Sequence, residues 1–238
     1  MKILKKHSDS HPLKKVLIIG NGGRENSLAW AFCKSEELEN VFITPGNGGS
    51  EEFAGCSKLD VQANNVEEII YQCLFQKIDL VVIGPEAPLA NGLADSLRES
   101  GIAVFGPSKE GAQLEASKDW AKQLMQEAQI PTAKHWTVNN VSEALGILNQ
   151  TNMPLVVKAD GLAAGKGVAV PENINETIEA IKNAFEGKFG DAGEKVVLEE
   201  KLRGPEVSIF ALCDGTQMII LPPAQDHKRL KEGDKGPN

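Results

Sequence analysis

The sequence has few of the residues that build metal centres and disulfide frameworks. Its 238 residues include four cysteines and four histidines, and no two cysteines form a Cys-x-x-Cys pair. Two of the histidines, His7 and His11, lie in the basic stretch that begins the chain. This spacing excludes a classical zinc site and a disulfide scaffold, so we expect reduced, mostly buried thiols and no metal ligands among these residues.

Long apolar runs and an excess of positive charge are also missing. No stretch approaches the ~20 apolar residues of a membrane helix. The opening segment "MKILKKHSDSHPLKK" lacks the apolar core of a signal peptide. The formal net charge of −8 at pH 7 argues against a general binder of nucleic acid or of anionic membranes. We therefore expect a cytoplasmic protein in which residues 1–14 form a disordered leader.

What is present is the composition and alternation of an α/β protein. Hydrophobic residues make up 41% and charged residues 24% of the chain, which is ordinary for a globular protein of one or two domains. The apolar run "VLIIG" (16–20) and the strands and helices that alternate after it predict a Rossmann-like, doubly wound parallel sheet. Beyond residue 112 the pattern changes to an α+β region with hairpin-like pairing. We expect domains at 15–114 and 115–238.

The loop after the first predicted strand, "GNGGREN", has the glycines of an anion-binding turn. Gly20, Gly22 and Gly23 would let backbone N–H groups and a helix N-terminus approach an anion. A dinucleotide fingerprint would need glycine where the chain has Glu25, and an acidic residue at the end of the second strand, which is absent. The loop favours a small phosphate-bearing molecule over NAD, and a tight turn without a ligand is the alternative.

Two further loops follow predicted strands, "TPGN" (44–47) and "GPEAPL" (84–89). Because the carboxyl ends of parallel strands meet at one edge of a sheet, we expect the three loops to converge on one ligand site. Asn47 and Glu86 are the candidate polar groups in these loops. The alternatives are a turn residue for Asn47 and a solvated acid for Glu86.

A second glycine-rich loop, "DGLAAGKGV", lies between two apolar strands. It is not a Walker P-loop, because Asp160 and Gly167 stand where that motif needs glycine and serine or threonine, and because a strand follows it. Its glycines supply backbone donors without bulk and Lys166 adds charge, so it can fold over phosphates as a flap. Lys158 on the preceding strand is expected to face the phosphates, with a surface lysine as the alternative.

These motifs together resemble the ATP-grasp ligases, and within them the phosphoribosylamine–glycine ligase family. The resemblance spans Val16 to Asn238 and rests on these stretches: "IGNGGREN", "TPGNGG", "GPEAPLANGLAD", "SKDWAK", "IPTA", "VVKADGLAAGKGV", "FGDAG", "VLEE" and "QDHKR". It implies that ATP phosphorylates the carboxylate of glycine to glycyl phosphate. The amine of 5-phosphoribosylamine then attacks it, which yields glycinamide ribonucleotide, ADP and phosphate. Such chemistry calls for positioning and charge neutralisation.

The resemblance also implies roles for individual residues. The nucleotide-binding set is Lys118, Lys158, Gly161, Gly165, Lys166, Gly167, Glu199, Glu200, Leu202 and Glu206. Within it the lysines take phosphates, Glu199 to Leu202 form the hinge that meets adenine, and Glu206 takes the ribose hydroxyls. From the residues alone, Glu199 and Glu200 would be strand-end charges and Lys118 a solvated side chain.

Two further sets follow from the same resemblance. The substrate-binding set for 5-phosphoribosylamine is Gly22, Gly23, Arg24, Glu25, Asn47 and Glu86, and the catalytic set is Lys158, Asp226, Lys228 and Arg229. His227 is either a general base or a loop histidine with a structural hydrogen bond. ATP with Mg²⁺ or Mn²⁺ is the implied cofactor, glycine and 5-phosphoribosylamine are the implied substrates, and the protein is expected to be a monomer without nucleic-acid or membrane partners.

The chain departs from the family pattern at three places. Asn26 stands where the family motif usually has histidine, and Pro205 occupies a position that is usually acidic or polar. The chain ends at "GDKGPN", where the family continues into a region that carries the metal ligands. We therefore expect an incomplete ATP-grasp portion with little or no ligase activity by itself and with exposed apolar surface.

Two other functions remain open at this point. The first βα turn by itself suggests an NAD(P)-dependent oxidoreductase, which the missing third glycine and ribose-binding acid disfavour. The lack of metal ligands is also consistent with a non-enzymatic module that binds nucleotides. Titration with NADH and with ATP separates the oxidoreductase from the ligase. ATP binding without glycine-dependent turnover supports the nucleotide-binding module.

Overall fold

The computed structural model describes residues 12–162, 167–187, 195–225 and 230–232. The chain divides into two compact units, Met1–Glu199 and Glu200–Asn238. The first unit holds two sheets and the second holds a short strand pair. Within the described ranges, we find no helix that combines the length and the apolar character needed to cross a membrane.

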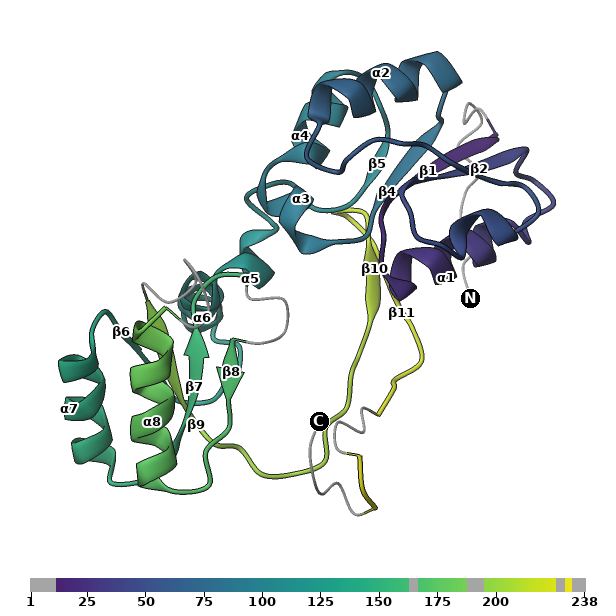
Figure 1. Cartoon of the computed structure of the whole chain (residues 1–238). Coiled ribbons are helices and arrows are strands. Elements are labelled where there is room, and N and C mark those ends of the chain that lie inside the picture. Colours follow the sequence, from purple (N-terminus) through teal and green to yellow (C-terminus); the bar gives the residue numbers. More distant parts are fainter. Residues whose placement is uncertain (1–11, 163–166, 188–194, 226–229, 233–238) are drawn as a thin grey trace. The chain divides into compact units, whose positions relative to one another are not determined.

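The first sheet has five strands in the order β3-β2-β1-β4-β5, and its strand pairs are parallel (Figure 1). Its strands are β1 (Lys15–Gly20), β2 (Asn40–Pro45), β3 (Cys56–Lys58), β4 (Leu80–Ile83) and β5 (Val104–Phe105). The apolar run of β1 is buried from Val16 to Ile19, as expected for a central strand with helices on both faces. The predicted doubly wound parallel sheet is therefore confirmed.

Helices cover both faces of this sheet because successive strand residues point to opposite sides. Leu17 and Ile19 of β1 join the core formed with α2 (Val66–Gln76) and α4 (Leu93–Glu99). The intervening Val16 and Ile18 join a second core with α1 (Gly23–Phe32). Two shorter elements, η1 (Ser50–Glu52) and α3 (Glu86–Ala90), follow β2 and β4.

The second sheet has four strands in the order β6-β9-β7-β8. Its strands are β6 (His135–Val138), β9 (Val196–Glu200), β7 (Leu155–Ala159) and β8 (Val168–Ala169), and its helices are α5 (Gln113–Ala116), α6 (Lys118–Glu127), α7 (Val141–Thr151) and α8 (Ile174–Phe185). The pairs β6–β9 and β7–β8 are antiparallel, which confirms the predicted α+β pattern.

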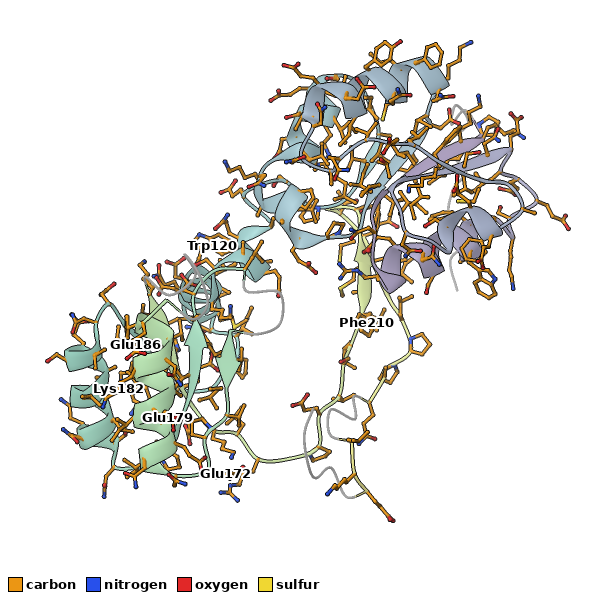
Figure 2. The ribbon with its side chains drawn as sticks, viewed as in Figure 1. Trp120, Glu172, Glu179, Lys182, Glu186 and Phe210 are labelled. Atoms are coloured by element: carbon orange, nitrogen blue, oxygen red, sulfur yellow. The ribbon has the colours of Figure 1, made fainter. Side chains whose placement is uncertain are left out.

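Helices α7 and α8 pack their apolar sides against this sheet. Leu148 of α7 and Ile181 of α8 lie in one core with Leu155 of β7 and Leu198 of β9. The other side of α8 carries charged residues, and Figure 2 labels the exposed Glu179 and Lys182 on this helix and the exposed Glu186 directly after it. The 3.6-residue period of the sequence thus decides which side of α8 is buried.

The second unit contains the antiparallel pair β10 (Ala211–Cys213) and β11 (Met218–Ile220). Its large apolar side chains are exposed, including Phe210, which is labelled in Figure 2, and Ile219. A two-stranded pair is marginal without a further layer to bury its apolar side chains. The expected exposure of apolar surface is therefore present in this part of the chain.

Candidate functional site

Three loops meet at the carboxyl edge of the parallel sheet, where they follow the neighbouring strands β2, β1 and β4. The side-chain amide of Asn47 donates to the carbonyl of Asn21 at 3.1 Å and to that of Gly22 at 3.4 Å. The guanidinium of Arg24 donates to Glu86 Oε1 at 3.0 Å. The predicted convergence of the loops is therefore confirmed, and polar groups from all three lie in contact.

Glu25 lies beneath these loops and is only 4% exposed. Its Oε2 accepts a hydrogen bond from the Gly22 N–H at 2.8 Å, and its Oε1 accepts one from Arg24 Nε at 2.9 Å. The carboxylate therefore caps the start of α1 and orients Arg24. Glu25 can therefore act on a ligand through the two groups that it holds, the Gly22 N–H and the guanidinium of Arg24.

Glycine at position 84 leaves the space that the Glu25 side chain fills. A Cβ atom on Gly84 would overlap the Cγ, Cδ and Oε1 atoms of Glu25. We expect Gly84→Ala to lower the free energy of unfolding by about 1–3 kcal/mol, because the held carboxylate has to move. Chemical denaturation measures this change. Gly23→Ala is the matched control, since its Cβ meets no atom within 4 Å, and an equal loss in both variants contradicts the expectation.

Arg24 is an accessible charged group of this edge, with 56% of its side chain exposed. The hydrogen bonds that its guanidinium donates to Glu86 and Glu25 raise the pKa of this group. In return, the hydrogen bond from Arg24 lowers the pKa of the Glu86 carboxyl, against a smaller opposing effect of burial. The guanidinium is therefore held in one place with part of its donors toward solvent, where it can meet an anion.

Sequence reasoning missed Ser50, a fully buried residue at the start of η1. Its hydroxyl donates to Asn26 Oδ1 at 2.9 Å and accepts from the Asn47 N–H at 2.9 Å. Asn26, where the family motif usually has histidine, thus links α1 to the loop after β2. Serine is common in turns, so the sequence carries no specific signal for this contact.

A second group of residues surrounds the glycine-rich loop after β7. The carboxylate of Asp160 accepts from the backbone N–H groups of Lys118 at 2.6 Å and Asp119 at 3.2 Å, and from the Ser117 hydroxyl at 3.1 Å. The ammonium of Lys118 donates to the Gly161 carbonyl at 2.9 Å. The start of the loop is therefore attached to the N-terminus of α6, where a carboxylate is favoured.

Asp160 acts as a cap supplied from the loop after β7, so its removal is expected to weaken α6. We expect Asp160→Ala to lower the free energy of unfolding by about 1–2 kcal/mol, because the N–H groups of Lys118 and Asp119 lose their acceptor. Thermal or urea unfolding measures this loss. The exposed loop acid Asp60 provides the control Asp60→Ala, and a similar loss there contradicts the assignment of a cap.

Lys158 and Glu199 form an ion pair on neighbouring strands of the second sheet. Lys158 Nζ lies 2.9 Å from Glu199 Oε1, and Lys122 Nζ lies 3.2 Å from Glu199 Oε2. The Glu199 and Lys122 side chains are buried, while 28% of Lys158 is exposed. The sequence analysis did not select Lys122. Its position four residues after Lys118 on α6 was the available signal, because such residues share one helix face.

Lys118 stands close to this cluster. Burial lowers the pKa of its ammonium, and the positive charge of Lys158 lowers it further, while Asp160 is the first of the carboxylates that raise it. Two lysines whose charges repel each other make a site that an anion would stabilise. The structure therefore brings together the two lysines that the sequence analysis selected for phosphate binding.

The remaining predicted residues divide into two groups. Gly167 is buried and its carbonyl accepts from the Ala159 N–H at 2.8 Å, while Glu200, Leu202 and Glu206 are exposed. The following lie outside the described residues: Gly165, Lys166, Asp226, His227, Lys228 and Arg229.

In the described ranges, neither a disulfide nor a metal-binding cluster is formed by the cysteine and acidic side chains. All four cysteines are free, and burial raises the pKa of Cys56 to about 11 and that of Cys73 to about 12. These two groups stay protonated near neutral pH and are poor nucleophiles. Among the residues that the structure describes, no group of three or more His, Cys, Asp or Glu side chains could hold a metal ion.

The chain is similar to proteins named phosphoribosylamine–glycine ligase. It is 52% identical over 224 residues to the phosphoribosylamine–glycine ligase of Nostoc sp., a match that covers 94% of this chain and 53% of that protein. The crystal structure of the phosphoribosylamine–glycine ligase of Thermotoga maritima superposes with a TM-score of 0.76 at 34% identity, over 94% of this chain and 53% of that one. The chain thus spans about half the length of the relatives it matches.

A more distant structure shares the fold alone. The biotin carboxylase domain of the Hydrogenobacter thermophilus 2-oxoglutarate carboxylase, solved with MgADP, superposes with a TM-score of 0.72 at 20% identity, over 94% of this chain and 52% of that one.

Both parts of the chain match models of one protein family. Residues 14–115 match the family described as the N domain of phosphoribosylglycinamide synthetase, and residues 116–238 match its ATP-grasp (A) domain. The second match alone covers more than half of the 238 residues. The chain therefore belongs to the phosphoribosylglycinamide synthetase family.

Proposed function

We propose that this chain contributes the substrate-binding and nucleotide-binding regions of an ATP-dependent ligase that joins glycine to 5-phosphoribosylamine. The products are glycinamide ribonucleotide, ADP and phosphate. The observation that carries the proposal is the pair of lysines, Lys118 and Lys158, beside a glycine-rich loop whose first carbonyl Lys118 binds. Family membership and the names of the relatives support it.

Lys118 and Lys158 are proposed to hold the phosphates of ATP. A lysine on a strand and a lysine at a helix start are both fixed in position by the backbone, so their ammonium groups need little reorganisation. ATP would supply the phosphoryl group that activates the glycine carboxylate. The glycine-rich loop would exclude water from this group, and the hinge from Glu199 to Leu202 with Glu206 would take the adenosine.

The 5-phosphoribosylamine is proposed to bind at the carboxyl edge of the parallel sheet. Gly22 and Gly23 lie at the N-terminus of α1, whose end favours an anion such as a phosphate, while the Gly22 N–H itself already donates to Glu25. Arg24 adds a guanidinium held by Glu25 and Glu86, and Asn47 joins two of the loops. The catalytic roles of Asp226, Lys228 and Arg229 also remain proposals.

Mg²⁺ or Mn²⁺ is proposed as the metal that accompanies ATP, since the biotin carboxylase domain of similar fold was solved with MgADP. The described residues do not themselves form a site with three or more acidic, histidine or cysteine ligands. The proposal therefore assigns none of them to the metal.

We also propose that these 238 residues by themselves have little or no ligase activity. The exposed apolar side chains of the pair β10–β11 lack a covering layer, and the described residues offer no metal cluster. Further proposals are the domain limits at 15–114 and 115–238, a monomeric state, a cytoplasmic location and the absence of nucleic-acid and membrane partners.

Ligand titration and product analysis test the proposed function. We expect ADP to bind the 238-residue chain saturably and NADH not to compete with it. We also expect that ATP, glycine and 5-phosphoribosylamine yield little glycinamide ribonucleotide with this chain and a normal yield with a polypeptide of the relatives' full length that contains it. Binding of NADH in place of ADP overturns the proposal in favour of an oxidoreductase. ADP binding without glycine-dependent turnover in the longer polypeptide favours a binding module.

A further inference from the structure

A buried carboxylate shared by two lysines lies at the centre of the proposed nucleotide site. Glu199 has one lysine on each oxygen, Lys122 on Oε2 and Lys158 on Oε1. One carboxylate and two ammonium groups leave a net charge of +1, while the positive charge of Lys118 nearby is offset by the carboxylate of Asp160. An arrangement with surplus positive charge in a partly buried site favours the arrival of an anion.

The two lysines are held to different degrees. Lys122 is buried on α6, and its ammonium also donates to the Thr132 hydroxyl at 2.7 Å. Lys158 is more exposed, and although its Nζ lies 2.9 Å from Glu199 Oε1, that oxygen receives no hydrogen bond of acceptable geometry from a described residue. The distance and the poor geometry together describe a charge contact that is close but not well aligned. The ion pair of Lys122 is the longer of the two, so the burial of Lys122 and its hydrogen bond to Thr132 are what distinguish the two lysines. Lys158, which is more exposed, is therefore the partner that can leave.

A buried carboxylate that loses its counter-charge is costly, so one lysine must stay when the other moves. We infer that Lys122 is a positioning residue: it holds Glu199 so that the ammonium of Lys158 can move from this carboxylate to a phosphate group of the nucleotide. The inference rests on the proposed function for the identity of the phosphate ligand. In this inference the side chain of Glu199 serves as the counter-charge of the two lysines. The family resemblance gives the Glu199–Leu202 hinge a different role, a contact with adenine made largely by its backbone.

Removal of Lys122 leaves Lys158 as the main counter-charge of Glu199. We expect Lys122→Met to weaken ADP binding by about 10- to 100-fold, the size of a charged hydrogen bond, because Lys158 then stays with the carboxylate. Adenosine has no phosphate, so its affinity is expected to remain within about threefold. In the double variant K122M/E199Q the carboxylate is gone, Lys158 is released, and ADP affinity is expected to recover. A merely structural role of Lys122 would not produce this recovery.

Amine labelling provides a second readout that needs no nucleotide. Acetic anhydride reacts only with neutral amines, and mass spectrometry of the peptide that contains Lys158 measures the rate. We expect Lys158 to react more slowly in Lys122→Met, where it stays paired with the carboxylate of Glu199, and faster in K122M/E199Q, where that carboxylate is absent, than in the unmodified chain. Lys122→Gln, which keeps a donor for Thr132, replaces Lys122→Met if that variant does not fold.

The two readouts separate the inference from the proposed function. The expected order of labelling rates supports the inference even if the unmodified chain binds no ADP, a result that would count against the proposed function alone. Unchanged labelling rates overturn the inference whatever the nucleotide data are. Equal losses of ADP and adenosine affinity in Lys122→Met, or no recovery in the double variant, also overturn it.

Discussion

Glu199→Gln is expected to lower the free energy of unfolding by about 3 kcal/mol, because it removes the charge that compensates a buried lysine. Among the described residues, Lys122 would keep the Thr132 hydroxyl as a hydrogen-bond partner but would lose its ion pair. Glutamine has nearly the volume of glutamate, so the loss reports charge and not a cavity. For a chain of this length, a change of this size lowers the melting temperature by roughly 6–12 °C. Urea unfolding and calorimetry at pH 7 measure both quantities.

Glu200→Gln is the matched control for this experiment. Glu200 is the next residue on β9, but it is exposed, so its charge is solvated by water. We expect the free energy of unfolding of the Glu200→Gln variant to differ from that of the unmodified chain by less than about 0.5 kcal/mol. Stability in K122M/E199Q should exceed that in Glu199→Gln, since the uncompensated ammonium has been removed. Equal stability of the Glu199→Gln and Glu200→Gln variants would show that Glu199 is not a buried counter-charge.

Lys158→Met is expected to weaken ADP binding by about 10- to 100-fold, which corresponds to the loss of a hydrogen bond between charged groups. The stability of the variant should change little, because Glu199 keeps Lys122 as its partner. Isothermal titration with ADP measures the affinity, and titration with adenosine shows whether the loss depends on phosphate.

Lys182→Met is the control for the loss of a positive charge. Lys182 lies on the exposed side of α8 (Figure 2) and has the same charge and length as Lys158. We expect its ADP affinity to equal that of the unmodified chain. The assignment of Lys158 to the nucleotide phosphates fails if both variants lose affinity equally, or if Lys158→Met loses adenosine as much as ADP.

The parallel sheet and its loops were predictable from the sequence because the signals are local. Short apolar runs such as Val16–Ile19 belong to strands buried on both faces, and the structure places these residues in two cores. Parallel order then brings the loops after β1, β2 and β4 to one edge without further information. The roles assigned to Gly22, Arg24 and the other loop residues stay predictions.

Short and edge elements were missed or misjudged for physical reasons. The strand β3 (Cys56–Lys58) has three residues and no apolar run, and only its hydrogen bonds to β2 define it. Helix α3 (Glu86–Ala90) lies in the stretch 84–89 that the sequence analysis took as a loop, and Gly92, at φ +92°, separates it from α4. Neither feature has a periodicity long enough to be recognised in the sequence.

The sequence alone determined the fold class, the glycine-rich loops and the choice of Lys158, since each depends on residues that are neighbours in the chain. Lys118 was selected only through the family resemblance, because its immediate neighbours indicate a solvated side chain. Only the tertiary structure decided that Asp160 caps α6, that Glu25 lies under Gly84, and that Glu199 stands between two lysines. These contacts join segments that are far apart in the sequence. Burial removes water from each carboxylate, so its partner is whichever donor the packing brings near, and no local pattern specifies that donor.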